Sequence, residues 1–171
     1  MTQTKFFILL SFIFFQFSIT HSQSVEWLSV NDALKKSKSE NKLIFINFYT
    51  DWCGWCKRMD ATTFKDADII KMLNGNFLNV KFNAEGAETV IYKNKTYTNP
   101  NPSLRRSTHT FTPVILGQRI VFPSYAVLDA THNVIGVING FQQVDNLKTI
   151  LTYFIDKAYL HESFENYSKR Q

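Results

Sequence analysis

The sequence predicts an α/β protein whose central sheet is covered by helices on both faces. Short apolar runs with strand character alternate with helical patterns along most of the chain, as in α/β folds. The run at 43–49 is β-branched, aromatic and nearly continuous in its apolar character, as expected of a strand buried on both faces. The length of 171 residues allows one domain comfortably, or two small ones. No internal repeat or low-complexity linker divides the chain.

Six elements are predicted in the first half of the chain. In order they are a short strand at 25–29, a helix capped by Asn31 and ending near Asn41, the strand at 43–49, helices at 57–64 and 66–73, and a strand at 77–82. The helix at 66–73 has an acidic first turn, which suits the helix dipole. We expect Asn74-Gly75-Asn76 to end that helix.

The second half begins with a polar segment, residues 84–118, and returns to strand and helix patterns after it. The predicted elements are a hairpin at 90–98 with Asn94 in its turn, a short helix at 104–116 closed by Gly117, strands at 125–129 and 134–138 joined by a turn, and an amphipathic helix at 145–159. Pro113 limits the helix at 104–116, since proline lacks the N–H that a helix interior needs. The tail after Glu162 is polar, and no element is predicted in it.

The charge and cysteine counts exclude several classes of protein. The formal net charge is +5, but the chain has no dense basic run and Arg105-Arg106 is its only arginine pair, so nucleic acid is not expected as a partner. Two cysteines are too few for a disulfide-rich scaffold. No stretch after the N-terminal region is long and apolar enough to span a bilayer, so we expect no stable membrane insertion.

Residues 1–22 have the pattern of a secretory signal peptide. A lysine precedes a nearly unbroken apolar run at 6–17, and small residues follow it at the expected cleavage site. The alternative is a membrane anchor, but the run has about 12 residues and a spanning helix needs about 20. We therefore expect cleavage between Ser22 and Gln23, a mature domain at 23–171, and a periplasmic or secreted protein.

Cys53 and Cys56 form a C-x-x-C motif at the point where the predicted strand at 43–49 gives way to a helix. The free backbone N–H groups and the dipole at a helix N-terminus favour a thiolate, which is the reactive form of cysteine. We expect Cys53 to be the exposed thiol that attacks. Cys56, about one turn further in, is expected to be more buried and to release the product by attacking the mixed disulfide.

Two other interpretations of the cysteine pair stay open. One is half of a zinc site, which needs two further ligands. The mature chain offers only His109, His132 and His161, at irregular spacing, so we expect no metal. The other is a structural disulfide without reactivity, although a loop closed by so few residues adds little stability.

Three segments together resemble the thioredoxin-fold family. Residues 51–57, Asp-Trp-Cys-Gly-Trp-Cys-Lys, are similar to the active-site segment of the family. Residues 122–129 resemble its cis-proline strand, and residues 136–140 resemble the strand that follows, with its terminal glycine. The resemblance covers most of residues 25–160 and extends to the C-terminal domain of the periplasmic thiol–disulfide interchange protein. It implies a thioredoxin-like fold, with a central mixed β-sheet flanked by helices and with 84–118 as an insertion before the cis-proline strand.

The resemblance also implies roles for residues around the cysteines. Pro123 is expected to be cis and to pack against the pair, and the backbone of Phe122 to pair with an extended substrate segment. Trp52, Trp55 and Lys57 are expected to flank the thiols, with Trp52 mainly a packing residue and Trp55 an exposed substrate contact. No cofactor is implied beyond the redox-active disulfide of the two cysteines.

Two positions depart from the family pattern. Thioredoxins have a buried aspartate six residues before the first cysteine, where it helps to remove the proton of the second thiol. This chain has Asn47 there, and an amide cannot act as a base. The dipeptide Gly54-Trp55 also lacks the proline typical of thioredoxin.

Five residues of the segment 84–118 are candidates either for partner choice or for a solvated surface hairpin and loop: Tyr92, Tyr97, Arg105, Arg106 and His109.

The resemblance and the motif together predict a monomeric, single-domain thiol–disulfide oxidoreductase that acts on protein substrates with disulfides or thiols. The reducing direction is our first expectation, with a membrane electron donor that keeps the protein reduced. An oxidase or isomerase is the second. A third expectation comes from a different class: a non-catalytic thioredoxin-like binding module that docks partners on the segment 84–118.

Overall fold

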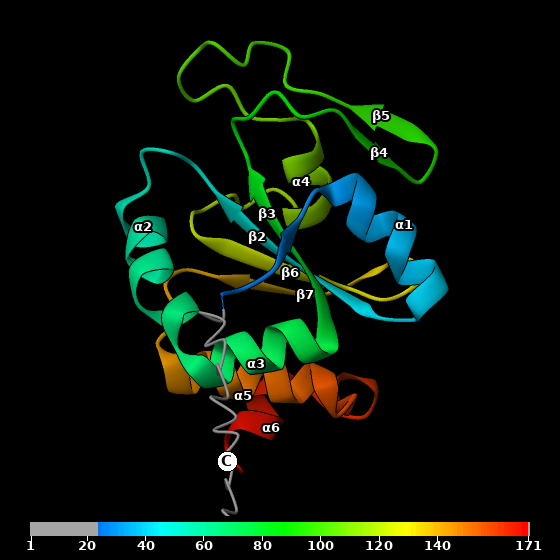
Figure 1. Cartoon of the computed structure of the whole chain (residues 1–171), viewed down its shortest axis with the longest axis vertical. Helices are drawn as coiled ribbons and strands as arrows, with labels where there is room; N and C mark the ends of the chain where they lie inside the picture. Colours follow the sequence, from blue (N-terminus) through cyan, green and yellow to red (C-terminus); the bar gives the residue numbers. More distant parts are fainter. Residues whose placement is uncertain (1–23, 171) are drawn as a thin grey trace, which may run out of the picture.

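The structure is a computed structural model that describes residues 24–170; the predicted signal peptide and its cleavage site lie outside the described residues. A five-stranded sheet forms its centre, in the order β1-β3-β2-β6-β7 (Figure 1). Its strands are β1 (Trp27–Leu28), β2 (Leu43–Tyr49), β3 (Phe77–Asn83), β6 (Ser124–Leu128) and β7 (Val134–Asn139). The sheet is mixed, because β1, β3 and β2 are parallel whereas β6 and β7 pair in antiparallel fashion.

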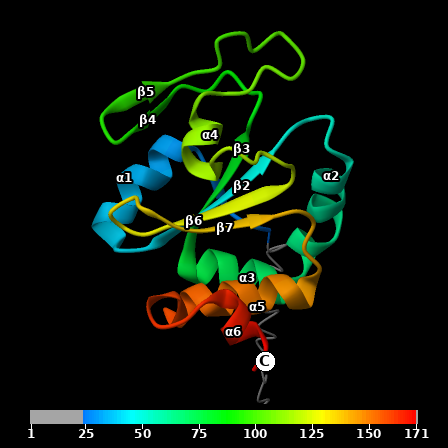
Figure 2. The same ribbon diagram turned by 180° about the vertical axis from the view of Figure 1, so that it is seen from behind.

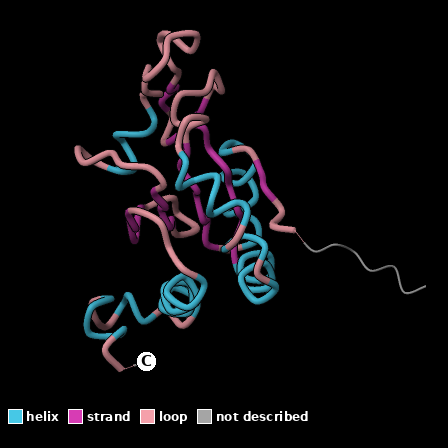
Figure 3. Tube along the Cα trace, turned by 90° about the vertical axis from the view of Figure 1, so that its left-hand side faces the viewer, coloured by secondary structure: helices cyan, strands magenta, loops and turns pink. Residues whose placement is uncertain are grey.

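Helices cover both faces of this sheet, as the sequence predicts. They are α1 (Val30–Glu40), α2 (Gly54–Ala61), α3 (Ala67–Asn76), α4 (Phe111–Leu116), α5 (Val144–Ile155) and α6 (Phe164–Ser168), with 3-10 turns at Thr63–Lys65 and Ala158–Leu160. In Figures 1 and 2, α1 and α4 lie on one side of the sheet and α3 and α5 on the other. The side view in Figure 3 shows the strands between these helix layers. The fold is therefore α/β and thioredoxin-like.

Strand β2 is buried on both faces, and its alternation defines two cores. Ile44, Ile46 and Phe48 belong to the core under α1 and α4, and Phe45 belongs to the core under α3 and α5. These four side chains are fully buried. Alternation places Asn47 on the same face as Phe45, toward the helices that follow the cysteine motif.

The predicted start of the first helix and the predicted end of the helix at 66–73 are wrong. Ser29, not Asn31, caps α1, because its side chain accepts a hydrogen bond from the Asp32 N–H at 3.1 Å. Asn31 lies inside the helix, where its amide bonds the backbone of Thr89 and Ile91 at 2.8 and 2.9 Å. Similarly, α3 does not end at residue 73 but continues to Asn76. The turn-forming asparagines are tolerated there because their side chains find partners outside the helix or in its last turn.

The helix predicted at 57–64 begins at Gly54, because Cys53 itself provides the cap. The helix predicted at 104–116 is shorter in the structure, where α4 covers only Phe111–Leu116. Pro113 lies in the first turn of α4, where a backbone N–H would have no partner within the helix, so proline is tolerated there. The residues before α4 form turns held by the Asn99 amide, which donates to the carbonyl oxygens of Glu85 and Ser107. The helix predicted at 145–159 ends at Ile155.

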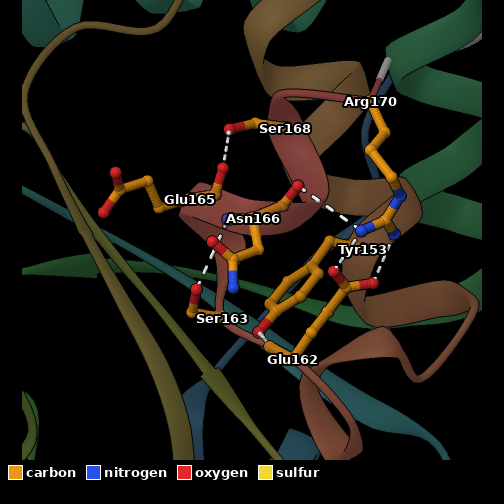
Figure 4. Close-up of polar contacts among 7 residues, drawn as sticks. All are labelled: Tyr153, Glu162, Ser163, Glu165, Asn166, Ser168 and Arg170. Atoms are coloured by element: carbon orange, nitrogen blue, oxygen red, sulfur yellow. Dashed lines mark hydrogen bonds and ion pairs between the residues drawn. The ribbon is translucent and has the colours of Figure 1, made fainter.

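The polar tail after Glu162 contains a short helix, α6, that the sequence did not reveal (Figure 4). Ser163 caps α6, and the Tyr153 hydroxyl donates to the Glu162 carbonyl at 2.6 Å. Arg170 forms an ion pair with the Glu162 carboxylate. The Tyr167 ring packs 5.3 Å from the ring of Tyr153 on α5. A helix of five residues is too short to show a periodic apolar pattern, which explains why it was missed.

The segment 84–118 contains the predicted hairpin, β4 (Val90–Tyr92) and β5 (Lys95–Tyr97), together with α4. It is not only a solvated surface loop. Tyr92, His109 and Phe111 are buried, and the Tyr92 hydroxyl donates to the His132 carbonyl oxygen at 2.6 Å. By contrast Arg105 and Arg106 are exposed. The segment thus completes the core under α1 and α4 and leaves a polar tip beyond it.

Candidate active site

A disulfide joins Cys53 and Cys56 at the junction of β2 and α2, with their sulfur atoms 2.08 Å apart. A turn after β2 is closed by a bond from the Cys53 N–H to the Thr50 carbonyl oxygen at 3.1 Å. This turn makes Cys53 the N-cap residue of α2, so that the Cys56 N–H donates to the Cys53 sulfur at 3.0 Å. The predicted placement of the motif at a helix N-terminus is therefore confirmed.

The cap position distinguishes the two sulfur atoms chemically. When the disulfide is reduced, a negative charge on the Cys53 sulfur is stabilised by the Cys56 N–H and by the positive end of the α2 dipole. Cys56 lies within the first turn of the helix. Cys53 is therefore the cysteine whose thiolate this geometry favours.

The expectation that Cys53 is the exposed thiol is not met in this oxidised structure. Cys53 is 4% exposed and Cys56 is 3% exposed, so accessibility does not separate them. The physical reason is that the disulfide holds the Cys53 sulfur against the buried Cys56 sulfur, while the helix N–H occupies another of its sides. The difference between the two cysteines lies in the cap position instead.

The loop before β6 carries the predicted proline. The peptide bond between Phe122 and Pro123 is cis, as the family resemblance implies. Pro123 is buried, and its carbonyl oxygen accepts from the Gly140 N–H at 2.8 Å. Within residues 24–170 the backbone N–H and C=O of Phe122 make no hydrogen bond. Both backbone groups of Phe122 are therefore unpaired in the described part of the chain.

Trp52 connects the cysteine turn to that loop and to the segment 84–118. Its ring meets the ring of Phe122 edge-on, with centroids 6.2 Å apart. Its indole N–H donates to the Glu85 carboxylate at 2.9 Å, and the Arg106 guanidinium lies 5.9 Å from its ring. Trp52 is nevertheless 45% exposed. The expectation that it is mainly a packing residue is therefore wrong, because its contacts cover only part of the indole.

Trp55 lies on the first turn of α2 and is 54% exposed, which agrees with its expected place on the surface. Its ring centroid is 5.3 Å from that of Phe141. The Arg58 guanidinium lies 5.4 Å from both rings. Lys57 is exposed on the same helix, and no ion pair involves it within the described part of the chain.

Asn47 is 2% exposed, and within residues 24–170 its side-chain oxygen has no hydrogen-bond partner. Its cross-strand neighbours are Lys81 on β3 and Tyr125 on β6. The Lys81 ammonium bonds the Asp60 carboxylate of α2 at 2.7 Å. Burial raises the pKa of the Tyr125 hydroxyl, and the Asp60 charge raises it further. Asp60 follows Cys56 by four residues and so shares its face of α2.

Sequence reasoning missed Asp60 and Lys81. A local signal for Asp60 exists, because a spacing of four residues from Cys56 places both side chains on one helix face. No local signal exists for Lys81, since its position opposite Asn47 depends on the register between β2 and β3. Arg106 and Phe141 were missed as neighbours of the tryptophans for the same non-local reason. Arg58 follows Trp55 by three residues on α2, so its contact with Trp55 did have a local signal.

Two histidines considered as zinc ligands have other partners. His109 is buried, with Nε2 2.7 Å from the Glu88 carbonyl oxygen and Nδ1 accepting from the Phe111 N–H at 3.0 Å. His132 Nε2 lies 2.9 Å from the Ser37 hydroxyl, and burial lowers the pKa of its imidazole. Within residues 24–170, no three His, Cys, Asp or Glu side chains are grouped so that they could hold a metal ion. None of the described helices is both long and apolar enough to cross a membrane.

A family model described as "Thioredox_DsbH: Protein of unknown function, DUF255" matches residues 16–103, which is slightly more than half of the chain. The chain belongs to the DUF255 family. The matched region contains β2, the cysteine turn, α2 and the start of the segment 84–118. The DUF255 match thus agrees with the thioredoxin-like fold that the sequence predicts.

Several known proteins are similar to this DUF255 chain. The thiol:disulfide interchange protein DsbD of Colwellia psychrerythraea is 36% identical over 47 residues, which are 28% of this chain and 8% of DsbD. The chain thus spans less than a tenth of the curated relatives it matches. A putative disulphide-isomerase from Bacteroides thetaiotaomicron shares the fold with a TM-score of 0.56 and 19% identity, covering 83% of this chain and 98% of that one. A structure named DsbH oxidoreductase has a TM-score of 0.51 and 20% identity. The match covers 75% of this chain and 85% of that one.

Proposed function

We propose that this DUF255 protein is a thiol–disulfide oxidoreductase that reduces disulfides in protein substrates. The observation that carries the proposal is the hydrogen bond from the Cys56 N–H to the sulfur of Cys53 at the N-terminus of α2. This bond favours a thiolate on one cysteine of a pair that can close into a disulfide. The unpaired backbone of Phe122 supports it further, since an extended substrate segment can pair there.

The proposed reaction moves two electrons from the cysteine pair to the substrate. The Cys53 thiolate attacks one sulfur of a substrate disulfide, forming a mixed disulfide and releasing the other substrate sulfur as a thiolate that takes up a proton. Cys56 then loses its proton and attacks the Cys53 sulfur, which breaks the mixed disulfide and frees the second substrate thiol. The products are a dithiol substrate and the oxidised pair seen in this structure.

The next cycle requires a donor of two electrons. We propose a dithiol of a membrane protein, which exchanges with the Cys53–Cys56 disulfide by the same chemistry in reverse order. The signal-peptide pattern of residues 1–22 supports action in the periplasm or outside the cell, where the protein is proposed to work as a monomer. The name of the DsbD relative, a thiol:disulfide interchange protein, agrees with this chemistry.

The direction of transfer is tested by two assays on the same purified protein. The reduced protein is expected to cleave the interchain disulfides of insulin under multiple turnovers with dithiothreitol as the electron donor. The oxidised protein is expected to introduce disulfides into a reduced, unfolded ribonuclease much more slowly. Faster oxidation than reduction would favour the oxidase or isomerase. Failure of both reactions, with Cys53 and Cys56 chemically inert, would favour the binding module.

A further inference from the structure

Two exposed tryptophans flank the disulfide, and an arginine lies over each of them. Arg106, from the loop between β5 and α4, lies over Trp52, and Arg58, from α2, lies over Trp55. The loop and the turn before α2 project on the same side of the molecule in Figures 1 and 2. The surface beside the reactive sulfur atoms is therefore lined by two arginine–tryptophan pairs that come from different elements.

Neither guanidinium of these two pairs is used by the fold. Within residues 24–170, Arg58 and Arg106 make no ion pair and donate no side-chain hydrogen bond. Glu85 accepts from the Trp52 indole and Asp51 accepts from an asparagine amide, and neither carboxylate forms an ion pair with Arg58 or Arg106. A guanidinium that stacks on a ring leaves its N–H edge free to bind a planar carboxylate in bidentate geometry.

We propose that this surface selects substrate segments that carry carboxylates on either side of the reactive cysteine. The inference rests on the proposed function and adds a substrate class to it. An acidic extended segment places its disulfide against Cys53 and its backbone along Phe122. Its aspartate or glutamate side chains then meet the free edges of Arg58 and Arg106, and its apolar atoms meet the exposed faces of the tryptophans.

Charge decides in favour of an acidic partner. Lys57 adds a third cation without an ion pair beside the two pairs, so three exposed cations face the two carboxylates of Asp51 and Glu85. Residues 23–171 carry 18 Lys and Arg against 14 Asp and Glu, a formal charge of +4. A basic segment meets repulsion from these groups, and a neutral one gains only the contacts with the rings. Since all three cations are exposed, dissolved salt should screen their attraction to carboxylates, and the preference for acidic segments should weaken as the salt concentration rises.

Three synthetic peptides of equal length test the proposal. Each contains one cysteine in a mixed disulfide with a small neutral thiol, flanked on both sides by glutamate, glutamine or lysine. The rate constant for reduction by the purified, reduced protein is measured by stopped flow at low and at high salt. We expect the glutamate peptide to react about tenfold faster than the glutamine peptide at low salt, with the lysine peptide slowest. The differences should shrink at high salt.

Single substitutions distinguish docking from a general electrostatic field. R58Q and R106Q should each lose several-fold of the preference for the glutamate peptide. R105Q is the matched control, because it removes the same charge one residue away from Arg106, at an exposed position with no aromatic contact in the described part of the chain. R105Q should keep both the preference and the rate with the glutamine peptide.

The possible outcomes separate this inference from the proposed function. Equal rates for the three wild-type peptides would overturn acidic selection and leave the reductase proposal standing. An R105Q effect as large as that of R106Q would also overturn it. The preference would then come from the general positive charge of the protein and not from docking on the Arg106–Trp52 pair. Failure to reduce any of the peptides would contradict the proposed function itself.

Discussion

Replacing Cys56 with serine is expected to leave the protein covalently attached to its substrate. The first attack needs only the Cys53 thiolate, whose stabilising donor is a backbone N–H that the substitution retains. The second attack loses its nucleophile, and the hydroxyl of serine cannot replace a thiolate in disulfide exchange. Because an intramolecular nucleophile is far more effective than one free in solution, the mixed disulfide should persist at least about 10²-fold longer.

The trapped species is measured by non-reducing electrophoresis and by intact mass after incubation with a disulfide-containing protein. Cys53→Ser is the matched control and should form no adduct, although it retains Cys56. Adducts of similar yield through either remaining cysteine would contradict the assignment of roles. An adduct formed only by Cys53→Ser would reverse it.

Replacing Asn47 with aspartate is expected to accelerate the release step at neutral pH. Asn47 lies on the sheet face toward α2, with Lys81 as one cross-strand neighbour. A carboxylate there is desolvated, which raises its pKa and suits it to accept the proton of Cys56. General-base assistance contributes about 10²–10⁴-fold in evolved sites. In this unoptimised site, where Lys81 is already paired with Asp60, we expect roughly tenfold or less.

The same substitution should reduce stability in a pH-dependent manner. An aspartate whose pKa is raised on folding binds more protons in the folded state than in the unfolded state. The free energy of unfolding therefore falls as pH rises from about 4 through the raised pKa, and the loss is complete above it. Chemical denaturation at several pH values measures this difference between N47D and the wild type.

Asn79→Asp is the matched control for the kinetic effect. Asn79 is also 2% exposed, but it lies near the start of strand β3, beside β1, and its amide donates to the side-chain oxygen of Asn74. N79D should lose stability and leave the release step unchanged. Stopped-flow decay of the mixed disulfide between pH 6 and 9 gives the rates. Identical pH–rate profiles for N47D and the wild type would show that residue 47 does not act on Cys56.

The strands and the reactive pair could be predicted because their signals are local. The run at 43–49 is apolar except for Asn47, and the structure places its strand at the same residues. The Cys53–Cys56 spacing and its position after that strand were sufficient to place the motif at a helix N-terminus, although the helix itself was expected only from residue 57. Helix ends were less predictable, because Ser29 and Asn31 are both good caps and the choice depends on contacts with β4, about 60 residues away.

The surroundings of the cysteines could not be predicted, because they depend on distant parts of the chain. Arg106 reaches Trp52 only through the fold of the loop after β5. Lys81 reaches Asp60 only because β3 pairs with β2. Such non-local contacts leave no periodic pattern in the sequence, and they bring Arg106 and Lys81 to the elements that carry the cysteines.

The central claim is that Cys53 and Cys56 form a redox couple that donates electrons, and a redox titration tests it most directly. The purified protein is equilibrated in dithiothreitol buffers of graded potential, and the reduced fraction is read by alkylation and mass. We predict one transition with a slope of about 30 mV per tenfold change in the thiol-to-disulfide ratio, as expected for two electrons, and a midpoint near the thioredoxin value of about −270 mV. A midpoint near about −120 mV, or no transition at all, would contradict the claim.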